Sequence, residues 1–190
     1  MTAIVAIANE DQGSVWMGGD SHSADPSIGR NQVRNDPKVW KFGPFVMGIS
    51  GSVRQAQIMQ YHFTPEDPGE DVMKYMVTKF VPELRDVLGK GQLAEDEPES
   101  PLPGGVLVGV RGHVYEIQAD YQVVDNADSF WSIGAASEYC LGALHALIYT
   151  SDCTTFAAPK VAIAIALGAA SKYSMFASEP YTMVEVHKDD

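Results

Sequence analysis

The sequence is poor in cysteine, has no excess of basic residues and contains no apolar run as long as a membrane-spanning helix. Its two cysteines, Cys140 and Cys153, provide neither a disulfide framework nor metal-ligand spacing, and we expect both to be reduced. The apolar run at the N-terminus covers only Ala3 to Ala8, with no basic residue before it. That run is too short for a signal peptide or for the roughly 20 residues of a membrane span. These absences predict a cytoplasmic protein.

The charge balance is acidic, with 25 Asp and Glu against 13 Lys and Arg and a formal net charge of −12 at pH 7. Nucleic acids and anionic membranes are bound through basic surfaces, so we expect neither as a partner. The five histidines are scattered without metal-ligand spacing, and the sequence predicts no metal and no cofactor. A length of 190 residues suffices for one domain with a full core.

The order of the predicted elements indicates an α+β fold. Strand patterns bounded by turn residues occur at 3–8, 14–18, 38–42, 45–49, 105–110, 113–117, 130–133 and 181–186. Helical spacing of apolar residues occurs at 53–63, 70–88, 136–149 and 158–173. Pro82 is expected to kink or split the second helix, and polar loops are predicted at 24–35 and 94–103. This grouping predicts a four-layer αββα sandwich, two antiparallel sheets flanked by helices, over residues 1–190.

The N-terminus carries a threonine at the start of the first strand. If Met1 is removed, the hydroxyl of Thr2 can attack a carbonyl, and its own α-amine, with a reference pKa near 8, can accept the proton. A threonine after the start codon is by itself an ordinary small residue. Its weight as a candidate nucleophile depends on residues further along the chain.

Three later residues make a coherent site with Thr2. Asp20 follows two glycines at the end of a predicted hairpin, and Lys38 begins the next strand. A lysine ammonium can lower the pKa around the nucleophile, and a carboxylate can hold that lysine charged and oriented. Gly48, before a predicted helix, can offer its backbone N–H to a developing oxyanion. Taken alone, such an aspartate is usually a turn residue and such a lysine is usually solvated.

These stretches resemble the proteasome β-subunit superfamily of N-terminal-nucleophile hydrolases, in particular the HslV peptidases. The similar segments are Thr2–Ile7, Gly19–Ser21, Pro37–Phe42, Met47–Ser52, Ser132–Ser137 and, in its spacing, Ser171–Val186. No single segment is specific, and the resemblance depends on their order and spacing along the chain.

The resemblance implies a threonine-type endopeptidase that forms an acyl-ester on Thr2. It implies that Asp20 and Lys38 are the supporting charge pair, that Gly48 is the oxyanion donor and that Ser174 supports the threonine amine. The side-chain pocket would be lined by residues near Val46, Ser23, Trp40 and Arg54. Relatives assemble into rings around their active sites, so the resemblance also implies a homo-oligomer, peptide or unfolded-protein substrates and a possible ATPase unfoldase partner.

The sequence departs from the family pattern at two positions. Ala135 replaces the serine that hydrogen-bonds the threonine amine in most members, and Ser171 stands where proteasome subunits have an aspartate, which HslV also lacks. In some HslV enzymes, backbone carbonyls of the loop matching Ser171, Ser174 and Ala177 bind sodium.

Two other functions stay open from the sequence. A catalytically inactive, ring-forming scaffold on the same fold is favoured by Ala135, whereas retention of Thr2, Asp20 and Lys38 argues against it. An amidase acting on a small molecule would be favoured by a narrow pocket filled by Trp40 and Arg54.

Overall fold

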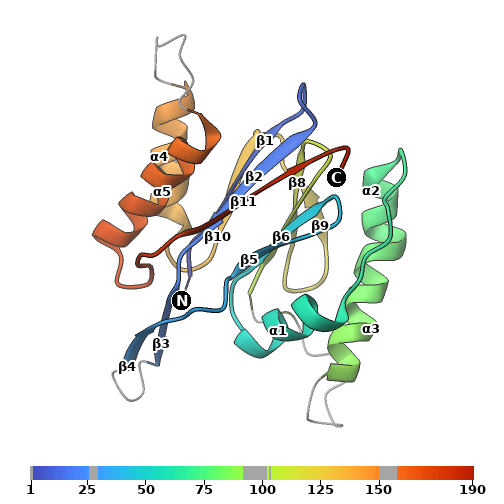
Figure 1. Ribbon diagram of the computed structural model, residues 1–190, viewed down its shortest axis with the longest axis horizontal. Coiled ribbons are helices and arrows are strands. Elements are labelled where there is room, and N and C mark those ends of the chain that lie inside the picture. The colour runs from blue at the N-terminus through green and yellow to red at the C-terminus, as the bar shows by residue number, and fades with distance from the viewer. Residues whose placement is uncertain (1, 26–29, 92–101, 103, 150–157) are drawn as a thin grey trace.

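The computed structural model describes residues 2–25, 30–91, 102, 104–149 and 158–190. They form four layers, with two antiparallel sheets at the centre and helices on both outer sides (Figure 1). The helices of one outer layer are α4 (Ser137–Tyr149) and α5 (Pro159–Tyr173). The opposite layer contains α1 (Val53–His62), α2 (Val72–Tyr75) and α3 (Val81–Gly91). The predicted αββα sandwich is confirmed.

The first sheet places the N-terminal strand at its centre. Its strand order is β10-β1-β2-β11, with β1 at Ile4–Asn9, β2 at Ser14–Gly19, β10 at Phe130–Ile133 and β11 at Thr182–His187. Ile4 pairs with Ile133 on one side and with Gly19 on the other. Because β1 is hydrogen-bonded along both edges, the backbone just before it is held in a fixed position.

The second sheet faces the first and has the order β5-β6-β7-β8-β9. Its strands are β5 (Val39–Phe42), β6 (Phe45–Ile49), β7 (Val106–Val110), β8 (His113–Ile117) and β9 (Val123–Asp125). The sheets approach closely where Gly109 lies, since a Cβ there would be 2.5 Å from Cγ1 of Val15 on β2 of the first sheet. Strands that are buried on both faces consist of continuous apolar runs. For this reason most strands of this sheet could be recognised in the sequence.

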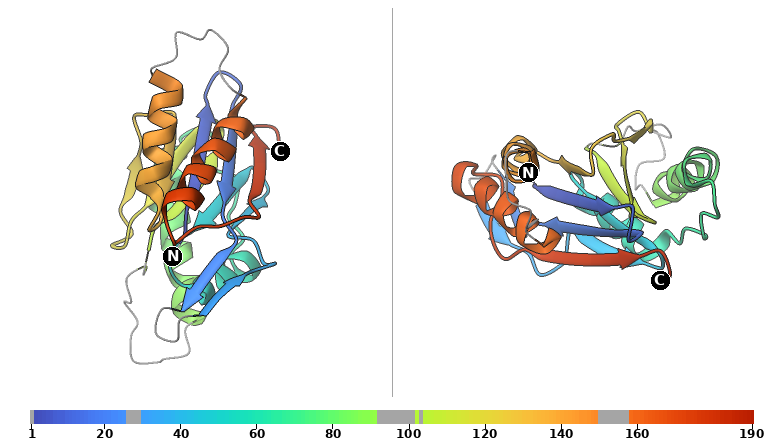
Figure 2. Two further views of the ribbon diagram at one scale, coloured as in Figure 1. Left: turned by 90° about the vertical axis from the view of Figure 1, so that its left-hand side faces the viewer. Right: turned by 90° about the horizontal axis from the view of Figure 1, so that it is seen from above.

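A small ribbon corrects the prediction of a polar loop at 24–35. Strands β3 (His22–Asp25) and β4 (Arg30–Val33) pair with each other as a separate two-stranded sheet. The ribbon lies at the end of the sandwich where the N-terminus and the start of α1 also lie (Figures 1 and 2). Its polar composition lacks the apolar alternation that reveals a half-buried strand, so the sequence did not predict it.

The helical stretch from α2 to α3 accommodates Pro82 by means of one wider helical turn. A π-helical segment, Met76–Phe80, joins α2 to α3, and the N–H of Val81 bonds to the carbonyl of Met76, five residues earlier. Pro82 has no N–H for the carbonyl four residues before it, and its ring crowds that carbonyl in a regular helix. The chain accommodates this with one π turn and stays helical to Gly91.

Two expectations from the sequence, on the acidic loop and on membrane-spanning helices, can be compared only with the described residues. The predicted acidic loop at 94–103 lies outside them except for Leu102, which is buried. Within the described chain, no helix is both long and apolar enough to cross a membrane.

Candidate active site

Thr2 lies two residues before β1 and is buried, with 5% of its surface exposed. Its carbonyl accepts the N–H of Ala136 at 3.2 Å. Gly134 packs against the same carbonyl with φ of +101°, and a Cβ on it would lie 2.3 Å from Thr2 O. Only glycine fits this close approach with a positive φ. The turn between β10 and α4 therefore holds the backbone of Thr2 in place.

Asp20, directly after β2, is fixed to the residue that follows Thr2. The N–H of Ala3 donates to Asp20 Oδ1 at 2.9 Å, and the N–H of Asp20 donates to Ala3 O at 3.2 Å. The other carboxylate oxygen accepts the N–H of His22 at 2.8 Å. Asp20 is almost fully buried, so its carboxylate is held by backbone donors rather than by water.

Lys38, directly before β5, joins Asp20 to Thr2. Its Nζ donates to Asp20 Oδ1 at 2.9 Å, to Thr2 Oγ1 at 3.2 Å and to the carbonyl of His22 at 2.6 Å. An ammonium group has three N–H donors, and each has an acceptor here. The side chain of Lys38 is 12% exposed and that of Asp20 is 0% exposed. The structure thus brings together three of the predicted site residues.

The surroundings of Lys38 shift its proton equilibrium. Burial lowers the pKa of Lys38 below its ordinary 10.5, the contact with Asp20 opposes this, and the charge of Arg34 lowers the pKa further. A buried cation bonded to the Thr2 hydroxyl favours the ionised oxygen electrostatically. The arrangement can therefore make Thr2 Oγ1 a better nucleophile.

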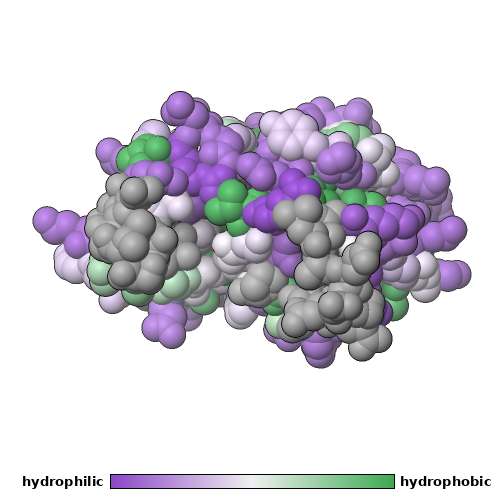
Figure 3. Space-filling view, turned by 90° about the horizontal axis from the view of Figure 1, so that it is seen from below, coloured by the Kyte–Doolittle hydropathy of each residue, from purple (hydrophilic) through white to green (hydrophobic). Residues whose placement is uncertain are grey.

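A cleft of about 150 Å³ opens beside Thr2. It is lined by Thr2, His22, Ser23, Arg34, Asp36, Pro37, Lys38, Ile49, Gly51, Ser52, Val53 and Ala56. Figure 3 views this end of the molecule, where hydrophilic side chains surround smaller apolar patches. A larger cavity of about 570 Å³ lies at the β1–β2 turn, at the other end of β1, and is lined by none of the predicted site residues.

The structure places Gly48 inside β6, outside this cleft. It pairs with Val39 on one side and Leu107 on the other, and a Cβ on it would lie 2.8 Å from Ile4 Cγ2. Gly51 lines the cleft instead. Its φ is +110°, and among the described residues its N–H has no hydrogen-bond acceptor. The sequence does not distinguish these two glycines, because the end of β6 between them cannot be located to a residue.

Ser174 is near the end of α5 and is not bonded to Thr2. Its N–H donates to Ala170 O at 2.9 Å, and its Oγ accepts the N–H of Phe176 at 3.1 Å. Ala135 lies exposed in the turn around the Thr2 carbonyl and has no hydroxyl to offer.

Of the four residues expected near the side-chain pocket, Ser23 alone lines the cleft. Val46 packs between the two sheets and Trp40 packs under the helices of the second layer. Arg54 is exposed on α1. Neighbouring strand residues point to opposite faces, so sequence distance from Lys38 alone did not reveal which side chains reach the cleft.

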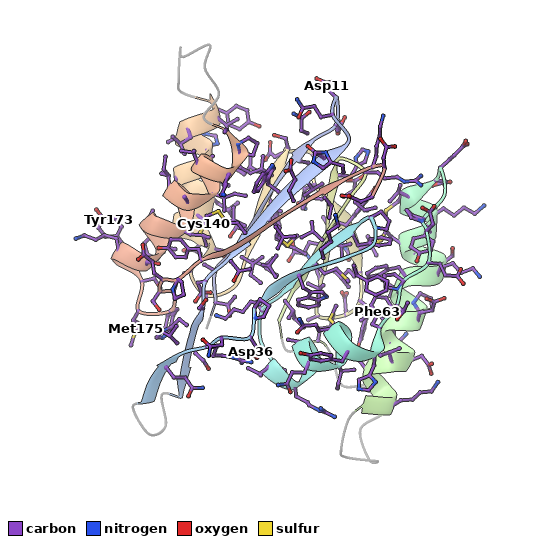
Figure 4. The ribbon with its side chains drawn as sticks, viewed as in Figure 1. Asp11, Asp36, Phe63, Cys140, Tyr173 and Met175 are labelled. Atoms are coloured by element: carbon purple, nitrogen blue, oxygen red, sulfur yellow. The ribbon has the colours of Figure 1, made fainter. Side chains whose placement is uncertain are left out.

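Three residues of the site were not predicted. The carbonyl of His22 accepts a hydrogen bond from Lys38 Nζ, and the Nδ1 of His22 lies 3.3 Å from Ser178 Oγ. Arg34 forms a salt bridge with Asp36, with its Nε 2.8 Å from Asp36 Oδ1. Figure 4 shows Asp36 on the segment between β4 and β5, toward α1. All three fall in or beside the polar stretch predicted as a loop, where no periodicity indicates an inward face.

Among the described residues, no group of three or more His, Cys, Asp and Glu could hold a metal ion. The arrangement of Thr2, Lys38 and Asp20 needs none for its chemistry, because a lysine ammonium supplies the positive charge beside the hydroxyl.

Comparison with known proteins gives matches among solved structures only. No family model matches the sequence, and no curated protein matches it significantly. The chain is similar to BPH of Thiobacillus denitrificans in complex with epoxomicin, with a TM-score of 0.76, 17% identity and coverage of 97% of this chain and 98% of that one. A second structure of that protein gives a TM-score of 0.72 at 16% identity, with 97% of each chain covered.

The chain is also similar to eukaryotic HslV from Trypanosoma brucei, with a TM-score of 0.68, 17% identity and coverage of 98% and 99%. At these identities the likeness is one of fold. The resemblance inferred from the sequence segments is confirmed at that level. The chain therefore has the fold of the HslV and proteasome β-subunit hydrolases.

Proposed function

We propose that this protein is a threonine-type endopeptidase whose nucleophile is the hydroxyl of Thr2, exposed with its α-amine when Met1 is removed. The observation that carries the proposal is the position of Lys38 Nζ, which bonds to both Thr2 Oγ1 and Asp20 Oδ1 in a buried site. A lysine and an aspartate buried behind a threonine are costly to keep. Their arrangement at the edge of a cleft is suited to activating that threonine.

The first half of the reaction forms an ester. Thr2 Oγ1 attacks the carbonyl carbon of the peptide bond, and its proton passes to the α-amine of the same residue. Lys38 stabilises the charge on the attacking oxygen, and Asp20 keeps Lys38 in position. As the C–N bond breaks, the ammonium of Thr2 gives its proton to the leaving amine. The acyl part of the substrate is then bonded to Thr2.

The oxyanion of this step needs donors on the wall of the cleft. We assign this role to the N–H of Gly51 in place of Gly48, because Gly51 lines the cleft beside Thr2. Gly51 is followed by Ser52, the N-cap of α1, whose Oγ accepts the N–H of Gln55. The positive end of the α1 dipole therefore adds to the stabilisation of the developing negative charge.

The second half releases the product. Water attacks the ester carbonyl, and the α-amine of Thr2 accepts a proton of that water. As the ester C–O bond breaks, the ammonium returns this proton to Thr2 Oγ1, which gives a carboxylic acid product and free Thr2. The enzyme returns to its starting state without metal or cofactor.

The proposal includes assembly and location. We infer a homo-oligomeric ring in the cytoplasm that acts on unfolded polypeptide, with an ATPase unfoldase as a possible partner. Large exposed apolar side chains are available for subunit contacts, among them Tyr173 and Met175 at 70% and 76% exposure (Figure 4). Light scattering after size exclusion tests the assembly, and co-purification of an ATPase from the native cells tests the partner.

Turnover of unfolded casein tests the peptidase activity. The wild-type protein is expected to cleave casein, and Thr2→Val, which keeps the shape of the side chain without the hydroxyl, is expected to lose cleavage. The second candidate function is an inactive scaffold, favoured by the missing hydroxyl at Ala135. Wild-type protein that assembles, lacks Met1 and leaves casein intact would support the scaffold.

A further inference from the structure

The cleft beside Thr2 has the size of one side chain. Its volume of about 150 Å³ equals the share of about five water molecules in the liquid. In the proposed reaction the acyl part of the substrate stays bonded to Thr2 through the intermediate. The side chain of the residue before the scissile bond is therefore the group that occupies this cleft.

The wall of the cleft carries hydrogen-bond donors and charged groups of both signs, because Arg34, Lys38 and Asp36 all line it. Arg34, which is ion-paired with Asp36, lines the cleft together with the N-terminus of α1 at Ser52 and Val53. The first N–H groups of a helix lack acceptors within the helix and favour negative charge. Lys38, also in the wall, is already neutralised by Asp20.

The charge of Arg34 acts inside the site more strongly than that of its partner. The side chain of Arg34 is 13% exposed, whereas that of Asp36 is 43% exposed, so solvent screens the carboxylate more effectively. The charge of Arg34 also contributes to the lowered pKa of Lys38. The positive charge of Arg34 in the cleft wall is therefore less screened by solvent than the negative charge of Asp36.

We propose, on the basis of the peptidase function above, that this cleft selects an acidic side chain before the scissile bond and that Arg34 is the specificity-determining residue. A substrate carboxylate in the cleft accepts a charge-assisted hydrogen bond from Arg34, and the end of α1 adds a favourable field. An amide of the same shape lacks the charge that Arg34 and the end of α1 favour.

The test uses four peptide vinyl sulfones that differ only in the residue next to the electrophile, which is Gly, Glu, Gln or Leu. Thr2 Oγ1 adds to the vinyl carbon and its proton ends on the neighbouring carbon, so the adduct has the mass of protein plus probe. Intact mass against time gives each labelling rate. We expect Glu to label at least about tenfold faster than Gln, as one charge-assisted hydrogen bond allows. Equal rates for Glu and Gln, or faster labelling by Leu, would overturn the inference.

Variants identify the residue responsible. Arg34→Met is expected to bring the Glu-to-Gln ratio to about one while the Gly probe still labels Thr2. Asp36→Asn is expected to raise the ratio, because Arg34 loses its competitor. Arg54→Met, an exposed arginine outside the cleft lining, is the matched control and should keep the wild-type ratio. Each ratio is measured within one variant, so partly unfolded protein lowers both rates and cancels.

The Gly probe separates this inference from the function it rests on. Labelling of wild-type Thr2 by the Gly probe, without preference for Glu, would leave the peptidase proposal standing and reject acidic selectivity. No labelling by any probe would reject the peptidase proposal and the selectivity with it. A preference for Glu that survives in Arg34→Met would show that Arg34 is not its source.

Discussion

At the scale of single residues, the site depends on how completely Lys38 is fixed. All three of its N–H donors have acceptors, and one of these is the hydroxyl of Thr2. Because the carboxylate of Asp20 is itself held by two backbone N–H groups, neither charge can move away from Thr2 without breaking several hydrogen bonds. This preorganised positive charge is what the proposed mechanism requires.

Removal of this charge should reduce the reactivity of Thr2. Lys38→Met is expected to slow labelling of Thr2 by the Gly vinyl sulfone at least about a hundredfold, measured by intact mass. Lys41→Met is the control, because Lys41 is 39% exposed and pairs with Asp190 at 2.8 Å, away from Thr2. Equal losses in the two variants would mean that Lys38 acts only through stability.

The pH profile of labelling should have two limbs. The α-amine of Thr2 must be deprotonated to accept a proton, so the rate is expected to rise as pH passes about 8. Lys38 must stay protonated, and its pKa is lowered from 10.5. As pH rises further, the rate is therefore expected to fall again, and this fall should begin before pH 10.5. A rate that is flat between pH 6 and 10, relative to intact folded protein, would contradict these two roles.

Ala135 offers a gain-of-function test. It is exposed in the turn that contacts the Thr2 carbonyl, at the position where the resemblance predicts a serine that bonds the threonine amine. Ala135→Ser should therefore speed labelling by a few-fold, about the effect of one neutral hydrogen bond. Ser137→Ala tests whether the neighbouring hydroxyl already supplies that bond, and a loss of rate in this variant with no gain in Ala135→Ser would assign the role to Ser137.

At the scale of elements, the site depends on the close approach of the two sheets. Gly109 on β7 faces Val15 on β2 and Val46 on β6, with no space for a Cβ. Gly109→Ala is expected to lower the free energy of unfolding by about 1–3 kcal/mol through overpacking. Gly142→Ala, in α4 with nothing within 4 Å of its added Cβ, is expected to raise it by about 0.5–1 kcal/mol. Chemical denaturation of both variants measures these changes, and effects of the same sign would contradict the packing argument.

The sequence predicted the elements that bury apolar side chains and missed those that do not. Strands β1, β2, β5 to β8, β10 and β11 and helices α1, α4 and α5 were located from apolar patterns and turn residues. The β3–β4 ribbon has polar residues on both faces, and β9 is only three residues long, so neither gave a periodic signal. Because this part of the chain gave no periodic signal, His22, Arg34 and Asp36 were not predicted as residues of the site.

The group formed by Thr2, Asp20 and Lys38 was predictable because each residue lies at the end or start of a recognisable strand. Gly48 and Ser174 show where such prediction stops. Both lie in segments with the right composition, and a difference of three residues decides that Gly51 rather than Gly48 reaches the cleft. Whether a side chain points toward Thr2 depends on tertiary packing that strand patterns do not specify.

At the scale of the whole molecule, burial in the sandwich keeps two tyrosines protonated to a higher pH than in the unfolded chain. Burial, assisted by nearby carboxylates, raises the pKa of Tyr75 and of Tyr115 from 10.0 to about 12. Unfolded chains lose these protons near pH 10, whereas the folded protein keeps them until about pH 12. The native state therefore binds more protons in this interval, and the free energy of unfolding should fall as pH rises from about 10 to about 12.

Denaturation at several alkaline pH values measures this loss of stability. Tyr115→Phe should make the fall between pH 10 and 12 shallower, because one of the two groups no longer titrates. Tyr61→Phe, at a side chain that is 74% exposed, should leave the slope unchanged. An identical slope in Tyr115→Phe and wild type would show that Tyr115 ionises normally in the folded protein.

The whole molecule is proposed to act through a free N-terminal threonine, and one measurement tests this most directly. It is the intact mass of the protein after expression in bacteria, with and without the Gly vinyl sulfone. We predict a mass that lacks Met1, and a single added probe that is absent in Thr2→Ala. A mass that retains Met1, with no adduct after prolonged exposure to the probe, would contradict a free Thr2 nucleophile and leave the structural role.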